Sequence, residues 1–308
     1  MQRSQTLIPI YSSSACQRIL RLLAIWALSV CGLTAHAAIT CSIAPPSAVN
    51  FAYVNSTTTL QQGSVSATCT RTLATDASST TLNLAANAGT NNTGQTSYVV
   101  LGTSKVSYSL YSDSACSNQW LKSNYGNYIG VPLSMPTVNV PVTSTFNYWG
   151  CMSSQSLSAY TAGLYTDTVG LQLLINGSTM ATASIAVSLY TPAACSISNG
   201  PSNLTFAYNA FSSSAVFAGT SFKANCSNNL PYTMALSPVS GVVAGLQYTL
   251  GLSLAAAGTA SVTGPSTVST TGNATGSATH YINGSMVAKQ AGQTGTPVPQ
   301  SHTLTLTY

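Results

Sequence analysis

The chain has 308 residues, of which 45% are hydrophobic and 4% are charged, which is typical of a folded protein and excludes collagen and charge-driven disorder. The formal charge of +5 at pH 7 falls by three when Arg3, Arg18 and Arg21 leave with the leader described below. No nucleic-acid-binding surface is therefore expected.

Titratable side chains are too few for most enzyme chemistry. After residue 37 the carboxylates and imidazoles are Asp76, Asp113, Asp167, His280 and His302. They are scattered and form no triad, dyad or metal-ligand spacing. We expect no catalytic residue, no metal ligand and no cofactor, so function must come from shape, hydrogen bonds and apolar contact.

Residues 1–37 resemble a secretory signal peptide. The apolar stretch from Leu22 to Leu33 is 12 residues long, whereas a membrane-spanning helix needs about 20. Ala35-His36-Ala37 fits the small-x-small cleavage pattern. The sequence predicts cleavage after Ala37, export, and an oxidising compartment in which cysteines pair.

The remaining six cysteines allow 15 pairings, but a repeat narrows them. Cys41, then Phe51-Ala52-Tyr53, then Cys69 recurs with similar gaps as Cys195, then Phe206-Ala207-Tyr208, then Cys226. This is the pattern of an internal duplication, in which each copy closes its own disulfide. The predicted pairs are Cys41 with Cys69, Cys195 with Cys226 and, by elimination, Cys116 with Cys151.

Short runs of alternating polar and apolar residues predict β-strands along the chain, as in Val106–Tyr111, Ile185–Leu189 and Thr303–Tyr308. No segment beyond the leader keeps a helical apolar stripe. The sequence predicts an all-β protein with two antiparallel β-sandwich domains, residues 38–190 and 195–308, joined by a linker at 191–194.

Several motifs in both copies carry a family resemblance. Tyr108-Ser109-Leu110-Tyr111-Ser112-Asp113 is followed by Trp120, and Gly163 to Thr168 opens a later strand. The second copy has Leu246 to Leu250, then Tyr281 to Gly284, then Gln290. The chain resembles the spore coat protein U domain family, found in subunits of archaic chaperone-usher pili. It departs from the pattern where Gln300 to Thr303 aligns with Tyr165 to Thr168.

The resemblance implies immunoglobulin-like domains that lack their last strand and receive it from the next subunit. The first domain supplies its own: a strand to Ile175, an Asn176-Gly177 turn and an alternating strand from Ala181 to Tyr190. The second domain reaches its equivalent strand at Thr303 to Tyr308, so it is expected to be open. Leu304, Leu306 and Tyr308 should face the core along the strand-acceptor edge, and Gly284 should correspond to Gly150.

The resemblance also implies partners: a periplasmic chaperone, an outer-membrane usher, and the next pilin subunit as strand donor. Ala38-Ile39-Thr40 is all that lies between the expected cleavage site and Cys41. The chain is thus expected to accept a strand but not to donate one. A subunit that accepts a strand but donates none can stand only at the end of a fibre. The sequence therefore predicts a two-domain adhesin, secreted through the periplasm, at the tip of a pilus on the cell surface.

Aromatic residues concentrate between Cys116 and Cys151, among Asn, Ser and Gly, as in adaptable binding loops. The predicted surface-binding residues are Trp120, Leu121, Tyr125, Tyr128, Ile129, Tyr148 and Trp149. Tyr125 to Pro136 is the better candidate for an exposed loop, whereas a core role is the alternative for each aromatic. Three functions stay open: an adhesin that attaches to abiotic or host surfaces and supports biofilm, a structural pilus or coat subunit, and a lectin-type adhesin.

Overall fold

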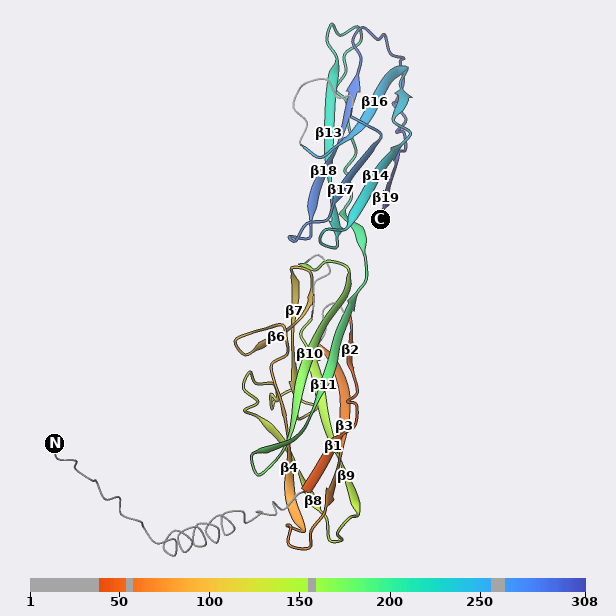
Figure 1. Cartoon of the computed structure of the whole chain (residues 1–308). Coiled ribbons are helices and arrows are strands. Elements are labelled where there is room, and N and C mark those ends of the chain that lie inside the picture. The colour runs from red at the N-terminus through yellow and green to blue at the C-terminus, as the bar shows by residue number, and fades with distance from the viewer. Residues whose placement is uncertain (1–38, 54–57, 155–158, 256–263) are drawn as a thin grey trace, which may run out of the picture.

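The computed structural model describes residues 39–53, 58–154, 159–255 and 264–308. The expected signal peptide and its cleavage site lie outside these residues. The described chain folds into two β-sandwiches that lie end to end (Figure 1). Within these residues no helix is long and apolar enough to cross a membrane.

The described residues of the first sandwich form eleven strands. They are β1 (Ile39–Ile43), β2 (Val49–Ala52), β3 (Thr59–Arg71), β4 (Ser79–Ala86), β5 (Asn92–Thr93), β6 (Thr96–Leu101), β7 (Ser104–Tyr111), β8 (Tyr128–Ser134), β9 (Pro141–Met152), β10 (Gly163–Ile175) and β11 (Ser178–Thr191). One layer has the order β1-β3-β9-β7-β6, and the facing layer has the order β8-β4-β10-β11-β2. A single bridge between Thr166 and Val100 connects β10 to β6.

Alternation along these strands places one set of side chains in the core. In β9, Phe146 and Tyr148 are buried while Thr145 and Asn147 face outwards, because successive side chains of a strand point to opposite faces. The core of the first sandwich includes inward residues of both layers, such as Leu110 and Val169.

In the second sandwich, eight strands lie within the described ranges. They are β12 (Cys195–Asn199), β13 (Val216–Cys226), β14 (Pro231–Ser237), β15 (Ser240–Val243), β16 (Leu246–Ser253), β17 (Thr267–Thr271), β18 (Ala278–Met286) and β19 (Thr303–Thr307). A five-stranded layer, β12-β13-β18-β16-β15, faces a three-stranded layer, β17-β14-β19. This sandwich has its own core, which includes Phe222, Met234 and Leu252.

The two sandwiches repeat one topology. The order β1-β3-β9-β7-β6 corresponds to β12-β13-β18-β16-β15, and β8-β4-β10 corresponds to β17-β14-β19. Among the described residues, the second sandwich has no strand equivalent to β11 or β2. The fold is thus two immunoglobulin-like sandwiches, and in the described part of the second one the place of β11 is not filled.

The disulfides follow the duplication. Cys41 and Cys69 face each other on β1 and β3, and Cys195 and Cys226 do so on β12 and β13. The third disulfide ties Cys116, in the turn after β7, to Cys151 of β9. These are the three pairs predicted from the sequence.

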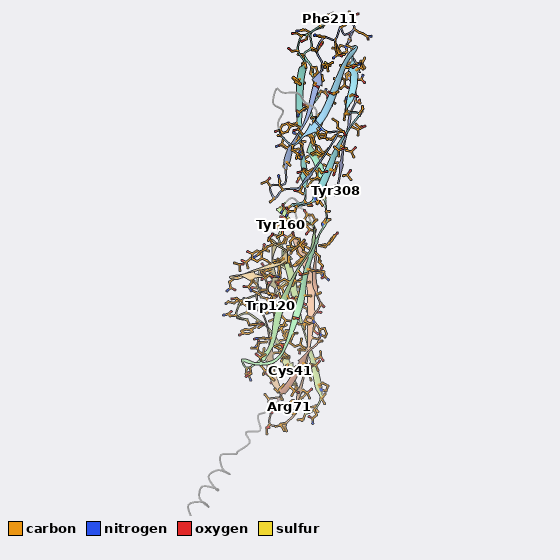
Figure 2. All side chains as sticks on the ribbon, turned by 45° about the horizontal axis from the view of Figure 1, so that its top comes forward. Cys41, Arg71, Trp120, Tyr160, Phe211 and Tyr308 are labelled. Carbon is orange, nitrogen blue, oxygen red and sulfur yellow. A yellow bond between two sulfur atoms is a disulfide. The ribbon has the colours of Figure 1, made fainter. Side chains whose placement is uncertain are left out.

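The two sandwiches are joined where a linker was expected, because β11 ends at Thr191 and β12 begins at Cys195. A second connection lies beside the linker: the Asn228 amide donates a hydrogen bond to the Tyr160 carbonyl, at 3.1 Å. Figure 2 shows Tyr160 and Tyr308 near this junction and Phe211 at the far end of the second sandwich.

Candidate functional site

The candidate site is the open edge of strand β19. Residues Thr303–Thr307 pair antiparallel with β14 on one side. Within the described chain, nothing pairs with the other side. The segment 204–208, which corresponds to β2 of the first sandwich, is not part of any strand.

In the first sandwich, β11 fills the place that is open in the second. It pairs antiparallel with β10 on one side and parallel with β2 on the other. Its inward side chains Ile185, Val187 and Leu189 are at most 1% exposed. The register places them opposite the β10 residues Val169, Asp167 and Tyr165, respectively.

Two glycines confirm that the walls of the two sites correspond. A Cβ atom on Gly150 would lie 2.9 Å from the ring of Phe51, and a Cβ atom on Gly284 would lie 2.6 Å from the ring of Phe206. Each glycine is therefore required so that a phenylalanine can pack directly on the backbone of a strand in the facing five-stranded layer. The predicted correspondence of Gly284 with Gly150 is correct.

Two tyrosines extend the correspondence to β19. The Tyr108 hydroxyl donates to Asp167 Oδ2 at 2.6 Å, and the Tyr248 hydroxyl lies 2.6 Å from Nε2 of His302. Burial, then the hydrogen bond to Asp167, raises the pKa of Tyr108. His302 thus has the position of Asp167, as the alignment of residues 300–303 with 165–168 predicted.

Equivalent apolar residues differ in exposed fraction between the first sandwich, where β11 is present, and the second. Val49 and Phe51 of β2, the strand that pairs with β11, are 0% and 3% exposed. Their counterparts Leu204 and Phe206 are only partly buried, although both pack against the second core. The open edge therefore leaves a strip of partly exposed apolar surface, which we call the acceptor groove.

The predicted acceptor-edge residues lie along this groove with one exception. Leu304 and Leu306 are partly buried and pack against the second core, as expected. Tyr308 is on the same face as Leu304 and Leu306 by strand alternation, but it is 59% exposed. Strand β19 ends at Thr307, so Tyr308 lies one residue beyond the paired backbone.

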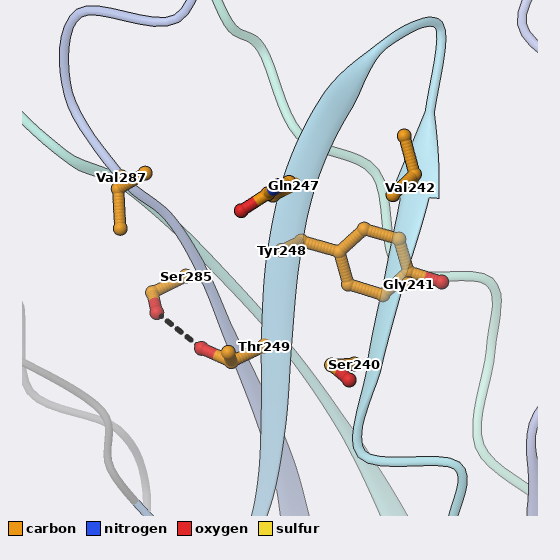
Figure 3. A pocket seen from close by; sticks show the side chains of 8 residues that line it. All are labelled: Ser240, Gly241, Val242, Gln247, Tyr248, Thr249, Ser285 and Val287. Atoms are coloured by element: carbon orange, nitrogen blue, oxygen red, sulfur yellow. Dashed lines mark hydrogen bonds between the residues drawn. The ribbon is translucent and has the colours of Figure 1, made fainter.

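A cavity of about 320 Å³ lies at the β15 edge of the five-stranded layer (Figure 3). Its lining offers hydroxyl, amide and methyl groups, and the Thr249 and Ser285 hydroxyls are hydrogen-bonded to each other at 2.9 Å. Tyr248, which lines this cavity, also contacts His302 through its hydroxyl at 2.6 Å. The lining residues are Ser240, Gly241, Val242, Gln247, Tyr248, Thr249, Ser285 and Val287.

Three of the predicted surface-binding residues belong to the core. Trp120, Leu121 and Tyr148 are 1%, 2% and 0% exposed, so their surface role is wrong. The Trp120 indole donates to the Leu84 carbonyl at 3.0 Å, and the Tyr148 hydroxyl donates to the Ser47 carbonyl. These bonds satisfy the polar atoms of buried rings. Burial also raises the pKa of Tyr148 to about 12.

The other four predicted residues reach the surface to different degrees. Tyr128 is 54% exposed. Tyr125 and Trp149 are partly buried, and the Tyr125 hydroxyl accepts a hydrogen bond from the Asn87 amide at 3.3 Å. Ile129 packs against the core. The predicted loop from Tyr125 to Pro136 is wrong over Tyr128–Ser134, which form strand β8.

Leu204 and Phe206 are site residues that the sequence analysis did not assign. Their signal was present, because Phe206 belongs to the repeated Phe-Ala-Tyr motif. From the sequence, the motif predicts the duplication and the disulfide pairing. Its place in the wall of the acceptor groove follows only from the positions of Gly284 and β19 in the fold.

Comparisons with known proteins give one family and several distant folds. Residues 27–172 match the Spore Coat Protein U domain family. No curated protein matches the chain. The CupB6 tip adhesin from Pseudomonas aeruginosa is a similar solved structure, at 12% identity and a TM-score of 0.36, covering 88% of this chain and 96% of that chain.

Two further structures concern CFA/I fimbriae. One, described as a chaperone-tip adhesin complex, has 10% identity and a TM-score of 0.34, covering 86% of this chain and 96% of that chain. The other is CfaE, the adhesive subunit from enterotoxigenic Escherichia coli, with 10% identity, a TM-score of 0.31, and coverage of 80% and 88%. Likeness at these TM-scores is too weak to carry a functional conclusion. The match over 27–172 contains β1 to β9 and most of β10, so the similarity to the Spore Coat Protein U domain family lies in the first sandwich.

Proposed function

We propose that the chain is a non-catalytic subunit of a chaperone-usher pilus, placed at the fibre tip, that mediates attachment and biofilm formation. The acceptor groove carries this proposal. An open strand edge beside an apolar groove is the surface that β-strand addition uses, because backbone hydrogen bonds give affinity and alternate side chains fill the groove. The donor is a strand of the next pilin subunit, and before assembly the chaperone covers the same edge.

The first sandwich supports the placement at the tip. It is closed by its own strand β11, so it needs no donor. After the expected cleavage site, Ile39 already belongs to β1 and pairs with Arg71 of β3. The chain thus presents one open sandwich to the fibre and one closed sandwich outwards, at the cell surface after passage through the periplasm and the usher.

The first sandwich also supplies a template for the test. Because β11 fills the groove equivalent to the open one, a synthetic peptide of its sequence, Ser178 to Thr191, should bind the second sandwich. Binding to the mature chain should raise the thermal midpoint of the second sandwich, since a ligand that binds the folded state alone stabilises it. Differential scanning calorimetry of the chain, with and without peptide, measures this.

A matched control peptide carries Ser in place of Ile185, Val187 and Leu189, which removes the inward side chains and keeps the outward ones. It should leave the midpoint unchanged. Equal stabilisation by both peptides, or none by either, would contradict strand capture in this groove.

A further inference from the structure

His280 is a histidine in the core of the second sandwich. It lies in β18, is 3% exposed, and its Nε2 lies 2.7 Å from the Tyr232 hydroxyl. Its ring centroid is 5.4 Å from that of Phe222 and 5.9 Å from that of Tyr232. The imidazole ring therefore packs against two aromatic rings.

The second ring nitrogen of His280 is buried without a partner. Nδ1 has no hydrogen bond among the described residues and is shielded from solvent. A neutral imidazole leaves this one nitrogen unsatisfied, at a moderate cost. A protonated imidazole would place an unpaired N–H and a full charge in an apolar core, at a much larger cost.

The repeat shows that a histidine is not required at this position. β18 pairs His280 with Phe222, whereas β9 pairs the equivalent Phe146 with Val65. The first sandwich thus has an aromatic hydrocarbon where the second has a titratable ring. From residue 38 to 191 the sequence contains no histidine.

The surroundings of His280 offer no charge that could compensate a proton. From residue 192 onwards the sequence has no Asp or Glu, and its Lys223 and Lys289 are exposed. Lys223 follows Phe222 in β13 but points to the opposite face. Tyr232 of β14 is the titratable side chain in contact with His280, and burial raises its pKa, so it stays neutral.

We propose that His280 makes the second sandwich acid-labile, so that mild acid loosens it while the first sandwich stays closed. Burial lowers the pKa of His280. As the pH falls below the ordinary histidine value of about 6.5, the unfolded chain takes up a proton that the folded chain refuses. The free energy of unfolding of the second sandwich therefore falls as the pH drops from about 6.5 towards the lower pKa of folded His280.

His302, the other histidine of the second sandwich, is a natural contrast. Its Nδ1 donates to the Pro238 carbonyl at 2.6 Å, and its Nε2 faces the Tyr248 hydroxyl oxygen at 2.6 Å. Both nitrogens thus face oxygen atoms that accept a hydrogen bond from the protonated ring as well. His302 is also partly exposed, whereas His280 is buried.

The consequence for assembly rests on the proposed function: a loosened second sandwich holds a donor strand less tightly. The experiment is made without a donor strand, so that acid lability and strand capture are tested separately. Hydrogen–deuterium exchange of the mature chain is measured at about pH 7.5 and about pH 5, corrected for intrinsic rates. Amides of β13 and β18 report on the second sandwich, and those of β3 and β9 report on the first.

Protection of β13 and β18 should fall by up to about tenfold for each pH unit below about 6.5, while β3 and β9 stay protected. His280→Gln keeps an acceptor for Tyr232 but cannot titrate, and His280→Phe copies the first sandwich. Both should abolish the acid-dependent loss, whereas His302→Gln should retain it. A flat wild-type profile, or an unchanged loss in the His280 variants, overturns the proposal. If these variants misfold, the NMR titration midpoint of His280 in the wild-type chain decides: a value below the ordinary one supports acid lability, and an ordinary value overturns it.

Discussion

His302 has the position in the second sandwich that Asp167 has in the first, and each binds the hydroxyl of an equivalent tyrosine at 2.6 Å. The two side chains differ in their other hydrogen-bond partners. Asp167 accepts hydrogen bonds from the backbone amides of Thr90 and Asn91, at 3.1 and 3.0 Å. The same position is thus a loop anchor in the closed sandwich and, in the open sandwich, a contact between β16 and the residues that lead into β19.

Replacing Asp167 by Ala should destabilise the first sandwich by about 3 kcal/mol, because it leaves a buried tyrosine hydroxyl and two backbone amides without an acceptor. Urea unfolding measures this loss, with hydrogen-exchange protection of the β10 amides as the readout for the first sandwich. Asp113→Ala is the matched control. Asp113 also accepts several backbone amides, which lower its pKa, but it is exposed, so water replaces the lost carboxylate. An equal loss in both variants would contradict the anchoring role of Asp167.

Alanine variants of the equivalent residues Phe51 and Phe206 should distinguish an effect on folding from an effect on donor-strand binding. Phe51→Ala should cost the first sandwich about 4 kcal/mol, as is usual for a buried phenylalanine. Phe206→Ala should cost the unbound chain less, because this ring is partly exposed. It should instead abolish stabilisation by the β11 peptide. Calorimetry of both variants with and without peptide gives the comparison, and undiminished peptide binding by Phe206→Ala would place the donor elsewhere.

The duplication could be predicted from the sequence because cysteine and aromatic spacings survive in both copies. The same spacings match β19 to β10, and among the described residues no strand of the second sandwich corresponds to β11. The walls of the acceptor groove could not be predicted from the sequence, because Leu204 and Phe206 lie in a segment without strand pairing. Its role depends on a glycine about eighty residues away in sequence, Gly284.

The faces of the aromatics could not be read from the sequence. Tyr148 and Trp149 are neighbours in β9, and strand geometry alone sends one ring to the core and the other outwards. Strand β8 was missed because Gly130 and Pro132 are poor strand formers. Proline is tolerated there because β8 pairs with β4 alone among the described strands, so it is an edge strand.

Removing the disulfide between Cys116 and Cys151 should weaken the first sandwich and leave the second unchanged. The bond closes a separation of 35 residues, which in the loop-entropy description contributes about 3 to 4 kcal/mol. Cys116→Ser combined with Cys151→Ser should lower the urea midpoint of the first sandwich. Non-reducing peptide mapping of the wild-type chain checks the pairing, and a bridge between the two sandwiches would contradict both the pairing and the duplication.

Tyr128 is the predicted surface-binding residue with the largest exposed fraction, and it gives the adhesion hypothesis its sharpest test. Its ring stands outwards on the edge strand β8, close in sequence to the partly buried Tyr125. An exposed aromatic ring can bury apolar area against a hydrophobic surface, which contributes about 25 cal/mol per Å² before ordering costs. Tyr128→Ser should therefore lower attachment of piliated cells to plastic without changing the stability of the first sandwich.

Tyr190→Ser is the control for this variant. Tyr190 is 62% exposed on β11, at the other end of the first sandwich near the junction, so its loss should leave attachment unchanged. Trp120→Ser should instead unfold the first sandwich, because that indole is in the core. Attachment through apolar contact should depend weakly on salt, since the mature first sandwich carries few charges. Full attachment by correctly folded, piliated Tyr128→Ser cells would contradict this surface, and inhibition by one particular sugar would favour a lectin-type adhesin.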